Sequence, residues 1–242
     1  MYGLKTLNVD WDTSNWAVTS LAYTFNTIQN ITELDLSSWN TSNWKVTNLS
    51  YAFSGLTSCE EIDFTGWDTS GWAVTNLSYM FNSDRSLKTI DLRHFDTSNW
   101  AVTTMAYMFN TCTSLETIDI STWDSTKWNV TVITAFIASC FCLQEVRMSA
   151  IPYNGSANNN RYTNFPTNYC ITRFDGFQMG VAHAYCDSYT GAFLLTPESL
   201  VSIFNRLKTV SSATTITIGR QNILKLTSEQ LAIATNKGWT VA

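Results

Sequence analysis

The sequence is poor in charge, proline and glycine. Charged residues make up only 14% of its 242 positions, and three prolines and ten glycines leave few chain-breaking points. Lysine and arginine number 14 against 19 aspartates and glutamates. Nucleic-acid binding needs a concentrated basic face to neutralise phosphates, so this balance argues against it. No apolar run approaches the ~18 residues of a membrane span, and the first ten residues lack the order of a secretory signal.

Motifs of catalytic or metal chemistry are also missing. The two histidines, His94 and His183, have no nucleophile motif around them, and no phosphate-binding loop or metalloprotease signature occurs. Cys140 and Cys142 are not spaced as zinc ligands are, and no calcium-loop pattern is present. We therefore expect no enzymatic activity, no cofactor and no metal centre, with His94 as a solvated surface residue.

Aromatic residues are abundant, and they recur with a fixed spacing. They make up 14% of the chain, and a motif with the outline Trp-Asp-Thr-Ser-Asn-Trp returns at constant intervals. Its copies begin at Trp11, Trp39, Trp67, Phe95 and Trp123, so that five units of equal length fill residues 11–150. Residues 4–9 match the end of a further unit, so Met1 falls inside a repeat and we expect the chain to be a piece of a longer protein or an engineered one. A period of this length predicts a repeat architecture.

Within each unit the apolar spacing changes between that of a strand and that of a helix. Residues 87–95 have the Leu-x-x-Leu-x-Leu outline of a leucine-rich repeat, which places alternate side chains inside. Leu77, Met80 and Phe81 follow the i, i+3, i+4 spacing of a short helix, with Thr75 before them as its cap. A single unit cannot bury its own apolar face. We therefore predict an α/β solenoid, a leucine-rich-repeat-like stack of five 28-residue strand-turn-short helix units with a parallel sheet.

Nine of the ten tryptophans fall into two columns of the predicted stack. The first holds Trp11, Trp39, Trp67 and Trp123, with Phe95 among them, and the second holds Trp16, Trp44, Trp72, Trp100 and Trp128. Each column has two interpretations, ring stacking in the interior or an exposed aromatic strip that packs on sugar rings. The inward strand position favours a structural role for the first column. The interior is also favoured for the second column, though less strongly, and this column is kept as a candidate aromatic strip.

These units resemble the BspA-type leucine-rich repeat family of bacterial surface proteins. The similarity covers about residues 1–150 and rests on the segments Ile90-Asp91-Leu92, Phe95-Asp96-Thr97-Ser98-Asn99, Ala106-Tyr107-Met108-Phe109 and Ser114-Leu115. The chain departs from the family pattern by two inserted residues, where Trp100-Ala101-Val102-Thr103 stands in place of Val-Thr. The resemblance implies adhesion or recognition at an extracellular location, with no catalytic residues to transfer.

The repeat pattern ends near residue 150. Residues 151–195 are irregular and rich in aromatic side chains, so we expect them to pack on the last unit. In residues 196–242, Thr196-Pro197 opens one predicted helix and the capping box Thr227 to Gln230 opens a second, each followed by a strand. We expect this C-terminal part to cap the stack, with a separate docking module as the alternative. Its sequence is similar to endings found after such repeats in proteins of gut bacteria and their phages.

Five of the six cysteines fall into two groups. We expect Cys59, Cys112 and Cys140 to be buried thiols, although Cys112 and Cys140 lie one unit apart in the same column and could reach each other as a disulfide. Cys170 and Cys186 are the best candidates for a disulfide, which would point to an oxidising compartment.

The outward positions of the predicted strands form a candidate ligand-binding face. Its residues are Glu33, Asp35, Glu61, Asp63, Thr89, Asp91, Arg93, Thr117, Asp119 and Arg147. Stacked carboxylates repel one another, so these acids need solvent and salt, a basic ligand or calcium as compensation, in that order of preference. A second acid column, Asp12, Asp68, Asp96 and Asp124, starts the turns and needs only its local backbone bonds.

Two functions of different class fit these features. We favour a non-enzymatic recognition or adhesion module that binds a host protein or glycan through the solenoid surface, on a bacterial cell or a phage particle. The alternative is a structural spacer or a phage tail or receptor-binding component. Ice binding by the threonines Thr13, Thr41, Thr69 and Thr97 is a remote third hypothesis, because tryptophan and aspartate would interrupt a flat surface.

Overall fold

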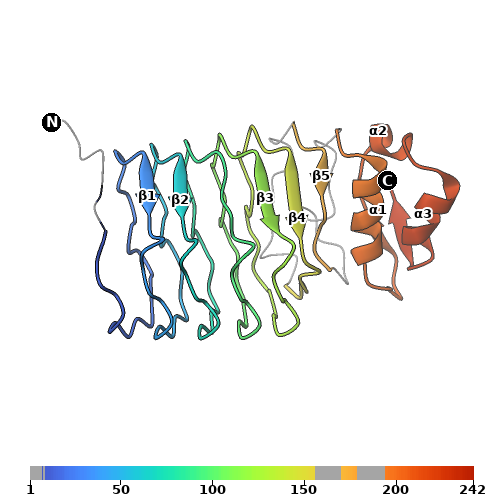
Figure 1. Cartoon of the computed structure of the whole chain (residues 1–242). Coiled ribbons are helices and arrows are strands. Elements are labelled where there is room, and N and C mark those ends of the chain that lie inside the picture. Colours follow the sequence, from blue (N-terminus) through green and yellow to red (C-terminus); the bar gives the residue numbers. More distant parts are fainter. Residues whose placement is uncertain (1–6, 8, 156–169, 179–193) are drawn as a thin grey trace.

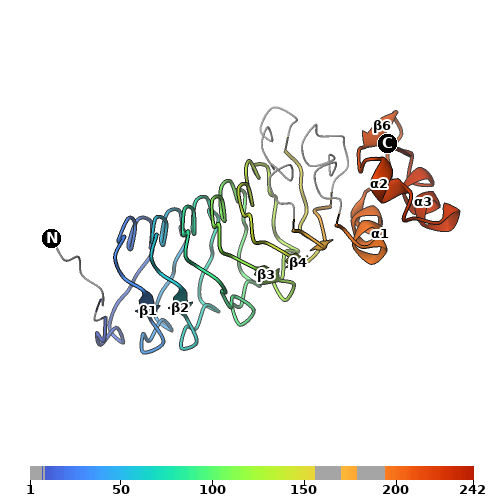
Figure 2. The ribbon, with the colours of Figure 1, turned by 90° about the horizontal axis from the view of Figure 1, so that it is seen from above.

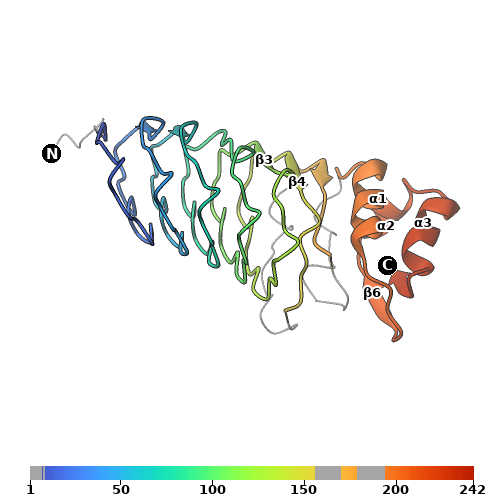
Figure 3. The same ribbon diagram turned by 60° about the horizontal axis from the view of Figure 1, so that its bottom comes forward.

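The repeats of the chain form a stack of coils. The structure, a computed structural model, describes residues 7, 9–155, 170–178 and 194–242. Successive 28-residue units lie side by side in sequence order, and the helices α1 (Pro197–Arg206), α2 (Arg220–Ile223) and α3 (Ser228–Thr235) gather at the C-terminal end (Figures 1 and 3). None of these described helices is long and apolar enough to cross a membrane.

Short parallel strands occupy one side of the coils (Figure 2). They are β1 (Glu33–Asp35), β2 (Glu61–Asp63), β3 (Thr117–Ile120), β4 (Glu145–Met148) and β5 (Arg173–Phe174). β1 pairs with β2, while β3, β4 and β5 form a second sheet, and paired residues are one repeat length apart in every case. Alternation along the strands buries Leu34, Ile62, Ile118 and Val146 and turns their neighbours outward.

A second line of hydrogen bonds joins the same coils. Isolated parallel bridges connect Ser20, Asn48, Asn76, Thr104 and Val132 in turn. Next to them, amides donate to the preceding coil, as from Ala73 to the Val46 carbonyl at 2.9 Å. Backbone bonds on both sides therefore fix each coil to its neighbour at two places, through Lys88 where the strands are interrupted. We propose that this stack is a leucine-rich-repeat-like solenoid.

The short helices predicted within the units do not form. Residues 77–83 make consecutive turns instead, and the Met80 amide donates to the Leu77 carbonyl at 3.3 Å. Alternate amides point to the next coil, as the Tyr79 amide donates to the Ala106 carbonyl at 2.8 Å. An α-helix uses these amides for its own i to i−4 bonds, so bonding between coils excludes it. The turns still bury Leu77, Met80 and Phe81, the apolar residues that the helical spacing places on one face.

Both tryptophan columns lie inside the stack except in the first coil, where Trp11 and Trp16 are exposed, so the candidate aromatic strip is wrong. Trp44, Trp72 and Trp100 are fully buried and Trp128 is 4% exposed, whereas Trp16, in the first coil, is 38% exposed. The rings of Trp44 and Trp72 stack at 6.3 Å between centroids. The two inserted residues explain the burial, because they extend an alternation in which the tryptophan of each unit and the valine two positions later both point inward.

The turn that follows each strand is held by its own side chains. The Ser70 amide and hydroxyl both bond to Asp68 Oδ1, at 3.0 Å and 2.6 Å, which confirms the local role of the turn aspartates. The threonine of the same turn is buried, and Thr69 Oγ1 donates to the Asp96 carbonyl of the next coil at 3.2 Å. Thr13, Thr41 and Thr97 are buried in the same way. The hypothesis of ice binding by this column is therefore wrong.

The repeat spacing continues one rung beyond its predicted end. β5 pairs with β4 so that Arg173 faces Glu145 and Phe174 faces Val146, again one repeat length apart. Phe174 is buried like the strand residues before it. This rung could not be recognised from the sequence because the tryptophan-aspartate turn motif is absent there. The rest of the predicted aromatic segment, residues 156–169 and 179–193, lies outside the described residues.

Helix α1 closes the open edge of the stack. It follows Thr196, whose Oγ1 accepts from the Ser199 amide at 3.2 Å. Ser199 Oγ accepts from the Phe174 amide at 2.9 Å and donates to the Phe174 carbonyl at 3.1 Å. One buried serine therefore satisfies both backbone groups of a residue on the edge strand, which protects that edge from pairing with another chain.

The remainder of the C-terminal part packs behind α1. β6 (Thr214–Ile216) pairs in parallel with β7 (Trp239–Val241). The predicted capping box at Thr227 and Gln230 is present and opens α3. Lys237 Nζ donates to the carbonyls of Phe204, Asn205 and Leu207 at 2.7–3.0 Å, and so binds the C-terminal end of α1 to α3.

Arg206 joins this C-terminal part to the stack. Its guanidinium donates to the Ser149 carbonyl at 2.5 Å, to Met148 at 2.7 Å and to Gly176 at 3.1 Å. We expect Arg206→Met to lower the free energy of unfolding by about 1–2 kcal/mol, because these buried carbonyls lose their donor. Urea unfolding measures the loss. Arg220→Met, an exposed position in α2, should change little, and an equal loss at both positions would contradict this role.

The cysteines within the stack are thiols. Cys59, Cys112 and Cys140 are free and buried, as predicted, and the disulfide between Cys112 and Cys140 is not formed. Burial raises the pKa of Cys59 and of Cys140 to about 12, so neither is a reactive thiolate. Cys170 is exposed and Cys186 lies outside the described residues, so their pairing stays a prediction.

Candidate ligand-binding face

All ten residues of the predicted strand face lie on one continuous surface. They line two adjoining hollows, of about 390 Å³ over the middle of the stack and about 170 Å³ over β1 and β2. Glu61 and Asp63 border both hollows. The smaller hollow adds Glu33 and Asp35, and the larger adds Thr89, Asp91, Arg93, Thr117, Asp119 and Arg147. The sequence therefore predicted a set of side chains that the structure brings together.

The larger hollow lies where the sheet is interrupted. Residues 89–92 match the strand outline but are not a strand, and they separate β2 from β3. The coil remains attached through Lys88, whose amide donates to the Glu60 carbonyl at 3.3 Å and whose carbonyl accepts from the Glu116 amide at 3.1 Å. Ile90 lines the hollow and is only half-buried, whereas its counterparts in β2 and β3, Ile62 and Ile118, are buried. A local loosening of the sheet thus makes the depression.

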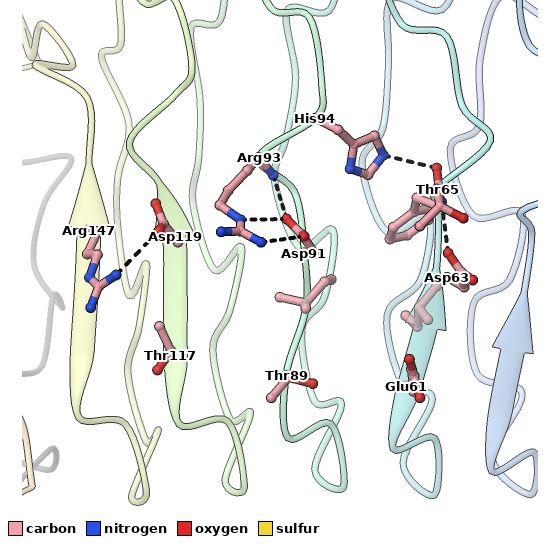
Figure 4. Close-up of a pocket in the computed structure, with 13 residues that line it drawn as sticks. Glu61, Asp63, Thr65, Thr89, Asp91, Arg93, His94, Thr117, Asp119 and Arg147 are labelled. Carbon is pink, nitrogen blue, oxygen red and sulfur yellow. Dashed lines mark hydrogen bonds and ion pairs between the residues drawn. The ribbon is translucent and has the colours of Figure 1, made fainter.

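Both charge signs meet in this hollow (Figure 4). Arg93 binds Asp91 with two bonds, at 3.0 Å from Nε and 2.8 Å from the terminal nitrogen. The side-chain bond to Arg93 lowers the pKa of Asp91 to about 2, and the same bond raises the pKa of Arg93. Arg147 lies 3.8 Å from Asp119 and binds Glu145 at 2.5 Å. Each arginine has a carboxylate partner and leaves more than two fifths of its side chain exposed.

The smaller hollow carries only acids among its charged groups. Glu33, Asp35, Glu61 and Asp63 line it together with Leu34. Asp35 accepts from the Ser37 hydroxyl at 2.6 Å and from the Ser37 amide at 2.9 Å, and these bonds lower its pKa. Among the described residues no group of three potential ligands is placed to hold a metal ion. The face therefore presents a fixed pattern of charge, acidic at β1 and β2 and mixed from residue 89 onward.

His94 stands at the upper rim of the larger hollow in Figure 4. Its Nε2 lies 2.9 Å from the Phe64 carbonyl of the preceding coil, and its ring contacts Phe95 edge-on at 4.9 Å. His94 is exposed, as expected, but it also ties two coils together. Among the described residues, its hydrogen-bond partner is a backbone carbonyl and not a nucleophile.

The surface aromatic column of the stack is formed by tyrosines, which the motif analysis missed. Tyr23, Tyr51, Tyr79 and Tyr107 occupy the same position in four successive units, and their rings stack at 4.3–4.7 Å. Tyr23 is 58% exposed and the other three are partly exposed. The spacing was visible in the sequence. The tyrosines do not flank the conspicuous turn motif as the tryptophans do.

These features define a repeat protein whose stacked coils present a charged face. A family model described as "Mycoplasma protein of unknown function, DUF285" matches residues 4–71 and 47–144, which together span more than half of the chain. The chain belongs to this family. No curated protein and no solved structure shows a significant match to it.

Proposed function

We propose that the chain is a non-enzymatic recognition module that binds a protein partner through its strand face. The observation that carries the proposal is the gathering of ten outward residues around two adjoining hollows. The resemblance of the repeat units to the BspA-type family favours a place on the surface of a bacterial cell or a phage particle, where adhesion is the expected role. Family membership by itself names no partner.

The charge pattern favours a protein over a glycan at this face. Arg93 and Arg147 stand beside carboxylates and remain partly exposed, while Glu33 and Glu61 extend an acidic surface over β1 and β2. Positive and negative groups at fixed positions attract a partner surface with the complementary charge pattern and repel surfaces with other patterns. A partner with basic residues opposite β1 and β2 fits this arrangement. An uncharged sugar would leave these groups without compensation.

Charge reversal on the acidic part tests the proposal. We expect Glu33→Lys with Glu61→Lys to weaken partner binding by about tenfold or more, because two favourable ionic contacts become repulsive. The measurement is surface plasmon resonance against a panel of purified extracellular-matrix and cell-surface proteins. Binding by the unaltered chain should also weaken as salt is added.

The matched control reverses two acids away from the face. Glu198→Lys with Glu229→Lys, both in the C-terminal helices, changes the net charge equally and should leave affinity unchanged. Equal losses in both variants would mean that net charge, not the strand face, governs binding. Absence of any bound partner across the panel would contradict recognition and favour the spacer.

The spacer remains the second candidate function. Coils joined along two lines of hydrogen bonds, with a core that runs through the whole stack, form a stiff body. Such a body can hold another domain away from a surface without any ligand of its own.

A further inference from the structure

The tyrosine ladder occupies backbone positions that disfavour large side chains. Tyr23, Tyr51, Tyr79 and Tyr107 have φ between 57° and 62°, the left-handed region that glycine and asparagine adopt most easily. Further along, each unit has a second left-handed position, which holds small residues, Thr27, Gly55, Ser83, Thr111 and Ser139. Each unit therefore has two left-handed positions. Small residues occupy the second of them, whereas tyrosine occupies the first in the first four units. Backbone strain that recurs in this way marks a site where the side chain has a use.

Mutual stacking does not by itself account for the ladder. Its rings lie closer together than those of the buried Trp44 and Trp72 pair, at 4.3–4.7 Å against 6.3 Å, and they are nearly parallel, within 8°. Yet they remain at the surface, and Tyr23 exposes 58% of its area. Stacked rings cover one another's faces, so the ladder presents ring edges and a row of phenol hydroxyls to solvent.

The four segments that carry the ladder are almost without charge. Residues 17–26, 45–54, 73–82 and 101–110 contain a single charged side chain, Lys45. Asparagines lie beside the ladder, and Asn110 Nδ2 donates to Asn82 Oδ1 at 2.8 Å. Burial, and then the neighbouring tyrosines, raises the pKa of Tyr79 to about 12, so its hydroxyl stays neutral at physiological pH. This surface differs from the strand face, where nearly every outward side chain is charged.

We propose that the tyrosine ladder is a second binding surface, which takes an uncharged linear glycan laid along the stack. Sugar hydroxyls bond to phenol hydroxyls and side-chain amides, and the sugar rings make van der Waals contact with the exposed ring edges. A protein partner would place charged side chains against a surface that cannot pair with them. Because equivalent groups recur in four consecutive units, a repeating polymer gains a further set of contacts with each unit it spans.

The test measures binding to immobilised neutral polysaccharides, namely β-glucan, mannan, galactan and chitin, and to their oligosaccharides of increasing length. We expect binding to at least one of them, with affinity rising with oligosaccharide length. Tyr51→Asn with Tyr79→Asn should weaken it by about tenfold or more, since asparagine keeps the left-handed backbone but removes ring and phenol. Tyr51→Phe with Tyr79→Phe keeps the stack and should also lose affinity, because the hydroxyls are gone.

Two controls separate binding from folding and from the strand face. Ser83→Asn with Thr111→Asn also places two asparagines at left-handed positions, but outside the ladder. This variant should bind glycan as the unaltered chain does. Glu33→Lys with Glu61→Lys should likewise leave glycan binding unchanged, which keeps this proposal distinct from protein recognition. The proposal is overturned if the unaltered chain binds none of these glycans, or if either folded tyrosine variant retains full affinity.

Discussion

Trp72→Ala should lower the free energy of unfolding by about 3–5 kcal/mol, a large part of the roughly 5–15 kcal/mol that stabilises a typical domain. Trp72 is fully buried in the middle of the stack. Its ring stacks on Trp44 at 6.3 Å and meets Trp67 at 5.4 Å. Truncation leaves a cavity between two coils that are each held in place by their neighbours. Urea unfolding followed by far-ultraviolet circular dichroism measures the loss.

The end of the same column supplies the control. Trp16 stacks on Trp44 at 6.3 Å as Trp72 does, but it lies in the first coil and is 38% exposed. Trp16→Ala should therefore destabilise by much less than Trp72→Ala, because it removes less buried surface and opens no enclosed cavity. Similar losses at both positions, or a Trp72→Ala variant within about 1 kcal/mol of the unaltered chain, would mean that the column does not form the core.

The positions of side chains across the strands could be predicted because they depend on two periods alone. Alternation along a strand decides which residues point outward, and the 28-residue spacing decides which of them meet. Asp35 and Asp63 are therefore neighbours on one face, as these two periods predict. The same reasoning applied to Trp100 and Val102 would have placed the second tryptophan column inside.

Features that depend on hydrogen bonds between coils could not be predicted in this way. The spacing of Leu77, Met80 and Phe81 is shared by a helix and by consecutive turns, and the choice is made by amides that bond to the next coil. The hollow is a second example. Residues 87–95 match the repeat outline well, yet residues 89–92 are not a strand, because pairing requires both adjacent coils to lie at the right distance and angle.

The glycine and tyrosine positions of the turns illustrate a related limit. Only Gly55 among the left-handed turn positions is a residue that suggests such a conformation from sequence. Tyr79 or Ser83 gives no such signal. The strain at these positions follows from closing each coil onto its neighbour, which is a property of the whole stack.

Asp84→Asn should stabilise the protein increasingly as the pH rises. Asp84 is completely buried, and the residues one unit before and after it are the buried Leu56 and Cys112. Its Oδ1 accepts from the Leu56 amide at 2.9 Å, while Oδ2 is buried and has no partner among the described residues. Burial disfavours the charged form and raises the pKa of Asp84 well above its usual value. Nearby Cys59 and Cys112 also have raised pKa values and supply no positive charge.

The sign of the pH dependence follows from proton binding. Between the ordinary aspartate pKa of the unfolded chain and the raised pKa of the folded chain, the folded state holds the extra proton, so stability falls as pH rises. The slope is at most about 1.4 kcal/mol per pH unit for one group. Asparagine has the shape of the neutral acid and keeps an acceptor for the Leu56 amide. The free energy of unfolding of Asp84→Asn should exceed that of the unaltered chain only slightly near pH 3. The difference should grow with pH until Asp84 ionises in the folded state.

An aspartate of opposite character provides the matched control. Asp68 lies in an exposed turn, and the bonds from Ser70 lower its pKa, so its contribution is present above the unfolded pKa and is lost as pH falls. Asp68→Asn should therefore be less stable than the unaltered chain at neutral pH and approach it in acid, the reverse of Asp84→Asn. Free energies of unfolding measured between pH 3 and pH 8 distinguish the two trends. A constant difference between Asp84→Asn and the unaltered chain across this range would show that Asp84 does not hold its proton in the folded state.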